Sequence, residues 1–322
     1  MRPSAASETH RADPRPFARD VGHHLSLSPR QLPSRYLYDD LGSVLFEAIC
    51  RLPWYPITRA ELGLIEAHRR DILGRVGPLT SVIELGPGSG VKLATLLATA
   101  RFRHDVTAHL VDVSEKALDV STRALEGHPR LRVVPHRAGY EEGLAAFARS
   151  WRGSGRSIVL CLGSNLGNFD RPYAEMFLRH VRACIAPGDF LLLGLDLVKP
   201  EAELLLAYDD PLGVTAAFNR NLLVRINREL GADFEVSDFA HRAVWNPAAA
   251  RIEMHLVSAL PQTVRVPKAN VTLRLRAGET IWTESSYKYG REEIGALLHE
   301  AGFAVVDQWT DAGFALTLAR GV

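Results

Sequence analysis

The sequence predicts an α/β fold in which a doubly wound, mostly parallel sheet is covered by helices on both faces. Short apolar strand-like segments alternate with helical ones from Leu79 onward, and this alternation is typical of such a sheet. A glycine-rich segment follows the first of these strands, at a strand-to-helix junction. The chain then ends in a helix and two strands joined by a very short turn, which predicts a terminal β-hairpin.

The expected strands are short, apolar and often β-branched: Ser81–Leu85, Thr107–Asp112, Leu131–Pro135, Ser157–Leu162 and Phe190–Leu197. The helical stretches between them are Lys92–Ala100, Glu115–Gly127, Glu141–Ser150 and Tyr173–Ile185. At the C-terminus, Glu292–Ala301 is predicted as a helix, with "GFAVVDQW" and "GFALTLAR" as the hairpin. This ending departs from the plain dinucleotide-binding pattern and resembles class I methyltransferases that use S-adenosylmethionine.

Two regions are not expected in this sheet. Residues 17–77 look mainly helical, and residues 200–286 begin with helices and continue with short alternating strands. We expect them to pack together as a second α+β lobe, over the edge of the sheet where ligands bind. Residues 78–199 then form the cofactor-binding domain, to which residues 287–322 return. Residues 1–16 are predicted to be a disordered tail, because they lack the apolar core of a signal peptide.

Composition limits the classes of partner. The 322 residues carry a formal net charge of +1, which offers no electrostatic reason to expect nucleic acid or an anionic membrane. No apolar run approaches the roughly 18 residues of a membrane span. The three cysteines lie far apart without metal-type spacing, which indicates a reduced, cytoplasmic compartment and no metal site. We therefore expect a monomer that acts on a small molecule.

The segment "SVIELGPGSGVK" (residues 81–92) contains G-x-G-x-G at Gly86, Gly88 and Gly90. A dinucleotide fingerprint requires its third glycine at position 91, which is Val91, and the Gly-Lys-Ser/Thr of a P-loop is absent. Asp112, at the end of the next strand, can accept hydrogen bonds from ribose hydroxyls. The pattern therefore favours S-adenosylmethionine over NAD, and a tight turn without a ligand is the remaining alternative.

Polar residues farther along are substrate candidates, each with a structural alternative. Asn168 in "LGSNLGNFDRP" either holds a substrate amine or caps the helix that follows. Tyr208, in a helical stretch, is either a pocket residue or an ordinary packing residue. Glu284 and Ser286 in "TESSYKY" share one face of an extended segment. Together they suit a polar ring with two nitrogens, or they belong to a solvated strand.

From about Tyr36 to the C-terminus the sequence resembles the histidine Nα-methyltransferases of ergothioneine biosynthesis. The segments that carry the resemblance are "RYLYDDLGSVLFE", "LPWYPITRAE", "IELGPGSGVK", "LGSNLGN", "LLGLDLVK", "AYDDPLGVTAAFNRN", "NRELGADF", "RIEMHL" and "TESSYKY". The resemblance implies successive methyl transfers from S-adenosylmethionine to L-histidine. The product would be Nα,Nα,Nα-trimethylhistidine (hercynine), in the first step of that pathway.

The resemblance also implies roles for individual residues. The methyl-donor site would comprise Gly86, Gly88, Lys92 and Asp112, with Gly139 and Tyr140 in the adenine loop. The amino acid's backbone end would be held by Tyr55, Asn168 and Tyr208. The imidazole site would comprise Glu284, Ser285 and Ser286, with Met254 alongside. Tyr38 and Gly163 fall at further pocket positions, and Tyr38 and Asn168 are the implied catalytic residues.

Overall fold

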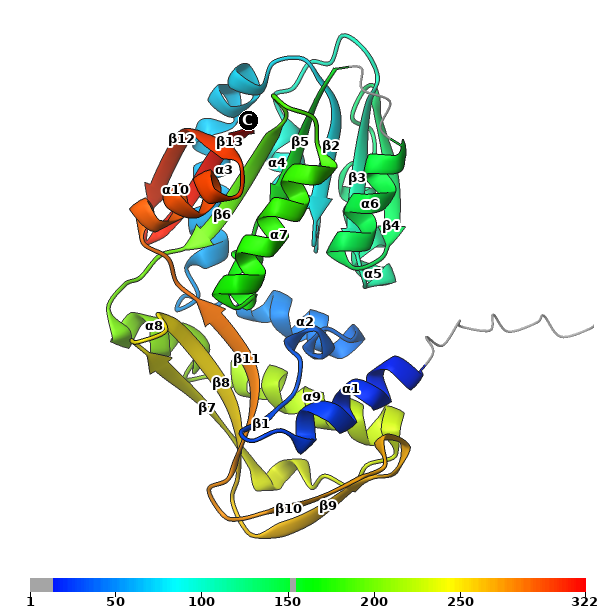
Figure 1. Ribbon diagram of the computed structural model, residues 1–322, viewed down its shortest axis with the longest axis vertical. Helices are drawn as coiled ribbons and strands as arrows, with labels where there is room; N and C mark the ends of the chain where they lie inside the picture. Colours follow the sequence, from blue (N-terminus) through cyan, green and yellow to red (C-terminus); the bar gives the residue numbers. More distant parts are fainter. Residues whose placement is uncertain (1–13, 151–154) are drawn as a thin grey trace, which may run out of the picture.

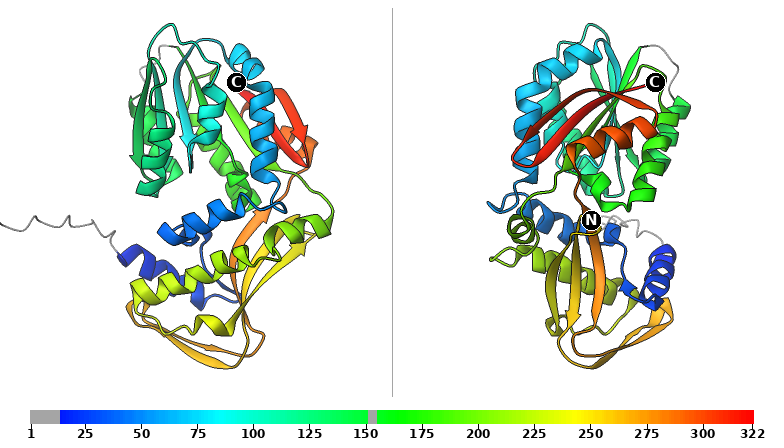
Figure 2. Two further views of the ribbon diagram at one scale, coloured as in Figure 1. Left: turned by 180° about the vertical axis from the view of Figure 1, so that it is seen from behind. Right: turned by 60° about the vertical axis from the view of Figure 1, so that its left-hand side comes forward.

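The computed structural model describes residues 14–150 and 155–322, which form two lobes (Figure 1). One lobe contains a seven-stranded sheet and the other a four-stranded sheet with a long helix across it. Figure 2 shows both lobes from two further directions, with connecting segments passing between them. No helix within the described residues is long and apolar enough to cross a membrane.

The seven-stranded sheet has the strand order β12-β13-β6-β5-β2-β3-β4. Its strands are β2 (Leu79–Leu85), β3 (Val106–Asp112), β4 (Leu131–Arg137), β5 (Arg156–Cys161), β6 (Phe190–Asp196), β12 (Phe303–Asp311) and β13 (Phe314–Gly321). Strand β13 is antiparallel to both of its neighbours, whereas β4, β3, β2, β5 and β6 pair in parallel. The predicted doubly wound sheet with a terminal hairpin is therefore confirmed, with strand ends shifted by one or two residues.

Helices cover both faces of this sheet. They are α3 (Ile57–Val76), α4 (Val91–Leu97) and α5 (Glu115–Ala124) on one face, and α6 (Tyr140–Ser150), α7 (Arg171–Cys184) and α10 (Arg291–Glu300) on the other. Successive side chains of a strand enter different cores, so Val82 belongs to one apolar cluster and Ile83 to the other. Double coverage explains why the central strands are continuous apolar runs. Edge strand β4 is only partly buried and tolerates Pro135.

The second lobe contains the sheet β1-β11-β8-β7 and the hairpin of β9 and β10. Its elements are α1 (Pro14–Ser26), β1 (Arg30–Gln31), η1 (Ser34–Leu37), α2 (Asp40–Ile49), α8 (Glu201–Tyr208), α9 (Val214–Leu230), η3 (Val236–Asp238), β7 (Phe239–Asn246), β8 (Arg251–Ser258), β9 (Gln262–Val266), η4 (Pro267–Ala269), β10 (Val271–Leu275) and β11 (Thr280–Tyr287). Strand β1 pairs in parallel with β11, and α2 packs against α9. The N-terminal segment and the insertion thus interleave in one lobe (Figure 1).

Two of the predicted boundaries are wrong. Helix α3, expected in the second lobe, packs against α4, β6, β12 and β13 of the large sheet. Its apolar stripe predicted burial, but periodicity does not say which surface a buried stripe will meet. The predicted tail also extends too far, since residues 14–16 form the first turn of α1. The remainder of that tail, residues 1–13, lies outside the described residues.

The lobes are joined by crossing segments that touch each other. Leu197, just after β6, forms a parallel bridge with Tyr289, just after β11. The Tyr289 amide donates to the Asp196 carbonyl oxygen at 3.1 Å, and the Val198 amide donates to the Tyr289 carbonyl oxygen at the same distance. These bonds hold the end of β11 next to the end of β6, directly beside the site described below.

Candidate active site

The carboxyl ends of β2 and β5 meet where the strand order reverses. The chain continues from β2 to β3 and β4 on one side, and then returns to β5 and β6 on the other. Open α/β sheets bind their ligands in the crevice at such a switch point. The glycine loop follows β2 and Gly163 follows β5, so sequence segments about eighty residues apart border the same crevice.

The glycine loop needs conformations that other residues avoid. Gly86, Gly88 and Gly90 have φ angles of 70°, 53° and 74°, in the region where side chains are disfavoured. A Cβ atom on Gly86 would lie 2.7 Å from Tyr140 Oη and 2.9 Å from Asn165 Nδ2. At Gly86 the loop therefore approaches the facing segments without room for any side chain.

The predicted nucleoside residues surround this loop. The Asp112 carboxylate accepts a hydrogen bond from the Ser114 amide at 2.8 Å and further ones from the Val113 and Gly88 amides. Burial raises the pKa of Asp112, and these backbone donors oppose the rise. Tyr140 begins α6 with its hydroxyl next to Gly86, while Gly139 has open space around its Cα. The loop after β2 and the ends of β3 and β4 thus come together.

Lys92 takes part in a buried arrangement that the sequence analysis did not single out. Its Nζ lies 2.6 Å from Oε2 of Glu61, which is fully buried on α3. The Gly163 amide donates to both carboxylate oxygens of Glu61, at 2.8 and 2.9 Å. Burial alone would lower the pKa of Lys92, but the Glu61 carboxylate raises it, so the ammonium stays charged. Glu61 therefore contacts both the glycine-loop helix and the end of β5.

Glu84, at the end of β2, adds a second buried carboxyl group. Its Oε2 has no hydrogen-bond partner among the described residues. Burial raises its pKa to about 8, with Lys92 acting against the rise and Glu61 and Asp112 adding to it. The carboxyl groups of Glu61 and Glu84 thus both act on the Lys92 ammonium. A cation is the ligand that such surroundings suit, and S-adenosylmethionine is cationic at sulfur and at its amino group, whereas a pyrophosphate is anionic.

A cavity opens from this crevice toward the second lobe. It is lined by Tyr38, Phe46, Ile49, Tyr55, Gly163, Ser164, Asn165, Asn168, Ala207, Tyr208, Thr215, Phe218, Met254, Glu284 and Ser286. Eight of the nine predicted substrate-side residues are in this set, contributed by segments from both lobes. The exception is Ser285, which does not line the cavity. Strand alternation directs its side chain to the face opposite Glu284 and Ser286.

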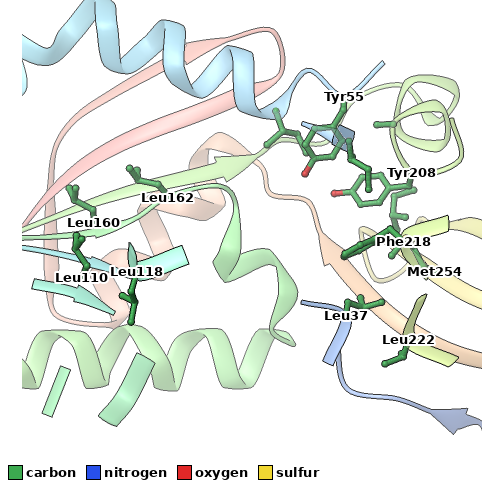
Figure 3. Close-up of a cluster of buried hydrophobic side chains, with 14 of the residues drawn as sticks. Leu37, Tyr55, Leu110, Leu118, Leu160, Leu162, Tyr208, Phe218, Leu222 and Met254 are labelled. Carbon is green, nitrogen blue, oxygen red and sulfur yellow. The ribbon is translucent and has the colours of Figure 1, made fainter. Parts of the chain in front are cut away.

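One end of the cavity is aromatic. Figure 3 shows Tyr55 beside Tyr208, with Phe218 and Met254 next to them; the centroids of the two tyrosine rings are 6.1 Å apart. Tyr38 lies edge-on to Phe218 at 5.5 Å. Burial raises the pKa of Tyr38 and Tyr55 well above the ordinary value. These hydroxyls therefore keep their protons at neutral pH and act as hydrogen-bonding groups.

The structure excludes the capping role of Asn168 and places both Asn168 and Tyr208 at the cavity. The side chain of Asp170, not of Asn168, caps α7 by accepting from the Tyr173 amide at 2.9 Å. Asn168 ends the short helix η2 (Asn165–Asn168) and lines the cavity. Tyr208 ends α8 with its hydroxyl 2.8 Å from Ser286 Oγ. Both are cavity residues in addition to any packing role.

Glu284 and Ser286 lie on the buried face of β11 and not on a solvated strand. Only 8% of Glu284 is exposed, and burial raises its pKa to about 7, while the nearby Lys288 lowers it. Lys288, fully buried, donates to Tyr208 Oη at 2.8 Å and to Ser286 Oγ at 2.9 Å, and its Nζ lies 2.9 Å from Asp196. Neither Lys288 nor Asp196 was predicted from the sequence as a site residue. Both lie within the quoted segments "TESSYKY" and "LLGLDLVK".

The sheet order, the glycine loop facing Asp112 and the carboxyl groups that suit a cation define an S-adenosylmethionine-dependent methyltransferase. The chain belongs to the family of histidine-specific, S-adenosylmethionine-dependent methyltransferases, whose sequence profile matches residues 17–320. It is 40% identical over 305 residues to a histidine N-alpha-methyltransferase of Mycobacterium tuberculosis, covering 94% of each chain.

Two further relatives span different lengths. A histidine N-alpha-methyltransferase of Mycolicibacterium smegmatis is 39% identical, again with 94% of each chain covered. The ergothioneine biosynthesis protein 1 of Neurospora crassa is 28% identical over 88% of this chain and 32% of its own. The chain thus corresponds to nearly the full length of the bacterial relatives and to one part of the fungal protein.

Proposed function

We propose that this protein transfers methyl groups from S-adenosylmethionine to the α-amino nitrogen of L-histidine, forming the trimethylated betaine hercynine in ergothioneine biosynthesis. The observation that carries the proposal is the cavity next to the glycine loop, which Glu284 and Ser286 line together with Asn168 and Tyr55. An acidic and a hydroxyl group suit the two nitrogens of imidazole. The names of the bacterial and fungal relatives support the same substrate and pathway.

The cofactor would be held by Gly86, Gly88, Lys92, Asp112, Gly139 and Tyr140. Asp112 would accept hydrogen bonds from the ribose hydroxyls, and the ammonium of Lys92 would pair with the carboxylate of the methionine part. When bound, S-adenosylmethionine supplies an electrophilic methyl group on a sulfonium. Glu84 keeps its proton at neutral pH without a ligand, and a cationic ligand beside it would favour its ionised form.

The histidine would lie with its backbone end at Tyr55, Asn168 and Tyr208 and its ring beside Glu284, Ser286 and Met254. Tyr38 and Asn168 would then be nearest to the reacting amine. Because the pKa of the Tyr38 hydroxyl is raised by burial, Tyr38 aligns the amine by hydrogen bonding and does not remove its proton. Catalysis is thus mainly orientation, together with desolvation that favours the neutral amine.

Repeated transfer requires space for each added methyl group. Gly163 just after β5 and Asn168 at the end of η2 line the cavity where the amine would meet the cofactor. A Cβ atom on Gly163 would lie 2.8 Å from Lys92 Nζ, so a side chain there would enter the border between the two sites. We propose that Gly163 keeps this border open for the methylated intermediates.

We also propose a cellular compartment and an oligomeric state for the protein. A net charge of +1 and free thiols at Cys50, Cys161 and Cys184 support a monomer that acts in the cytoplasm on a small molecule, without nucleic acid or a membrane as partner. Sedimentation velocity of the purified protein tests the monomer. A sedimentation coefficient that corresponds to a dimer would contradict it.

Mass spectrometry of a panel of amino acids incubated with the protein and S-adenosylmethionine tests the activity. Histidine is expected to yield mono-, di- and finally trimethylated products, with the other amino acids largely unchanged. Methylation of another amino acid in preference to histidine would overturn the proposed substrate. Absence of methylation for every member of the panel would overturn the proposed activity.

A further inference from the structure

Lys288 is the least expected side chain beside the cavity. It is 0% exposed and lies just after β11, where the chain crosses from the second lobe to α10. Its Nζ contacts Asp196 at 2.9 Å, while Lys199 donates to the other Asp196 oxygen at 2.5 Å. Burying an ammonium is costly unless it is paired. Asp196 supplies that pairing, and Lys288 has further hydrogens to donate.

These hydrogens go to two hydroxyls that line the cavity. Lys288 donates to Tyr208 Oη at 2.8 Å and to Ser286 Oγ at 2.9 Å, and the two hydroxyl oxygens are 2.8 Å apart. An ammonium has no lone pair, so both oxygens must accept from it. One hydroxyl hydrogen is used in the bond between Tyr208 and Ser286. A single hydrogen is left over to point away from the pair.

The charge of Lys288 selects where this hydrogen goes. A protonated ring would place an N–H and a positive charge against Ser286 Oγ, which already accepts from the Lys288 ammonium, and like charges at such a distance repel. The favoured order is therefore Tyr208 donating to Ser286, and Ser286 donating into the cavity. Glu284 lies two residues before Ser286 on the same face of β11. Its carboxylate is an acceptor that no described side chain occupies.

We propose that Lys288 is a positioning residue that makes this pocket recognise the neutral imidazole ring of histidine. The ring N–H donates to Glu284, and the unprotonated ring nitrogen accepts from Ser286. The inference rests on the proposed function, since it assumes histidine as the substrate. Lys288 touches neither the cofactor site nor the reacting amine, so it acts through the two hydroxyls.

Other titratable groups lie around Lys288 and the cavity, so the test needs a control for their effect on the pKa of the bound ring. They are Asp196 and Lys199 at the end of β6, Tyr208 on α8, Glu284 on β11, and Tyr38 and Tyr55 from the N-terminal segment. Lys199 offers a matched control, because it pairs with Asp196 as Lys288 does but donates to neither hydroxyl. Lys199→Met removes an equivalent buried charge and leaves the two hydroxyls with Lys288.

The test is nitrogen NMR of histidine carrying ¹⁵N in its ring, bound to the protein with S-adenosylhomocysteine, between pH 5.5 and 8.5. In the wild type the bound ring should stay neutral in one tautomer, with a pKa at least about one unit below that of free histidine. Lys288→Met should raise the pKa of the bound ring by about one unit or more, and weaken histidine binding about 10-fold. Lys199→Met should leave the pKa of the bound ring unchanged.

The outcomes separate the two proposals. If histidine does not bind the wild type, the proposed function fails and this inference fails with it. If histidine binds as imidazolium at pH 7, or if Lys288→Met and Lys199→Met behave alike, only the role of Lys288 is overturned. If Lys288→Met does not fold, the spectrum of the wild type is the test. A neutral bound ring supports the role of Lys288, and an imidazolium overturns it.

Discussion

The two sides of the proposed active site are built differently, although each contains a lysine paired with a buried carboxylate. On the cofactor side, backbone conformation dominates: the glycine loop has three positive φ angles within five residues. On the substrate side, residues of α2, η2, α8, α9, β8 and β11 surround one cavity. Lys92 with Glu61 serves the first side, and Lys288 with Asp196 serves the second. The first side is thus local in sequence and the second is assembled from distant segments.

The largest effect is expected from Gly86→Val on the cofactor side. A side chain there would meet Tyr140 and Asn165 below 3 Å, at a φ angle of 70°. We expect S-adenosylhomocysteine to bind about 100-fold more weakly or not at all in calorimetry. Gly127→Val is the matched control, since Gly127 also has a positive φ but nothing within 4 Å of its Cβ. Normal cofactor binding by Gly86→Val would show that the ligand lies elsewhere.

A smaller effect, confined to the substrate side, is expected from Glu284→Ala. Loss of this carboxylate leaves a ring N–H unpaired, at a cost of about 1–3 kcal/mol. The expected decrease in kcat/KM for histidine is about 10- to 100-fold, with cofactor affinity unchanged and discrimination against phenylalanine reduced. Ser285→Ala, on the opposite face of β11, should change kcat/KM less than about 2-fold. Wild-type kinetics for Glu284→Ala would mean that the ring lies elsewhere.

Glu61→Gln tests whether the two sides are independent. Glu61 holds Lys92 on one side and the Gly163 amide, which borders the cavity, on the other. Without its charge the ammonium loses its partner, at about 1–2 kcal/mol. We expect KM to rise about 5- to 20-fold for both S-adenosylmethionine and histidine. The control is Glu66→Gln on the exposed face of α3. If KM rises for S-adenosylmethionine alone, the hydrogen bond from the Gly163 amide to Glu61 does not contribute to histidine binding.

Glu84→Gln should have the smallest effect on ligand binding, and its effect on stability should depend on pH. The pKa of Glu84 is raised by burial from 4.5 to about 8, so the folded protein retains a proton that the unfolded chain loses. Its contribution to stability is complete below about pH 4.5 and is lost as the pH rises toward 8, by at most about 1.4 kcal/mol per pH unit. The Tm of Glu84→Gln minus that of the wild type should therefore increase between pH 5 and 8. Parallel Tm curves would contradict the buried, protonated state.

The arrangement of residues on the proposed cofactor side was largely predictable from the sequence, and that on the proposed substrate side only in part. Gly86, Gly88 and Asp112 were evident because a strand, a glycine loop and the next strand follow each other within about thirty residues. Glu284, Tyr208 and Asn168 had equally acceptable structural alternatives when taken singly. They were selected by resemblance to a family and not by their own pattern. The structure then brought them together in one cavity.

Some features had no usable signal. Glu61 looks like any acidic residue in an amphipathic helix, and nothing local shows that α3 packs on the large sheet instead of the second lobe. Lys288 resembles an exposed strand residue, although it is 0% exposed. The burial of a charged side chain depends on its partner, and Asp196 is ninety-two residues away in the sequence. Such pairs cannot be found from periodicity or spacing.

The sequence by itself determined the alternating strands and helices, the reversed last strand and the glycine loop. Each depends on hydrophobic periodicity or on the φ angles that glycine permits, and both are properties of neighbouring residues. Only the tertiary structure decided which lysine meets which carboxylate and which hydroxyls face the cavity. Those contacts join residues far apart in the chain. Their energies depend on burial, which exists only once both lobes have folded around them.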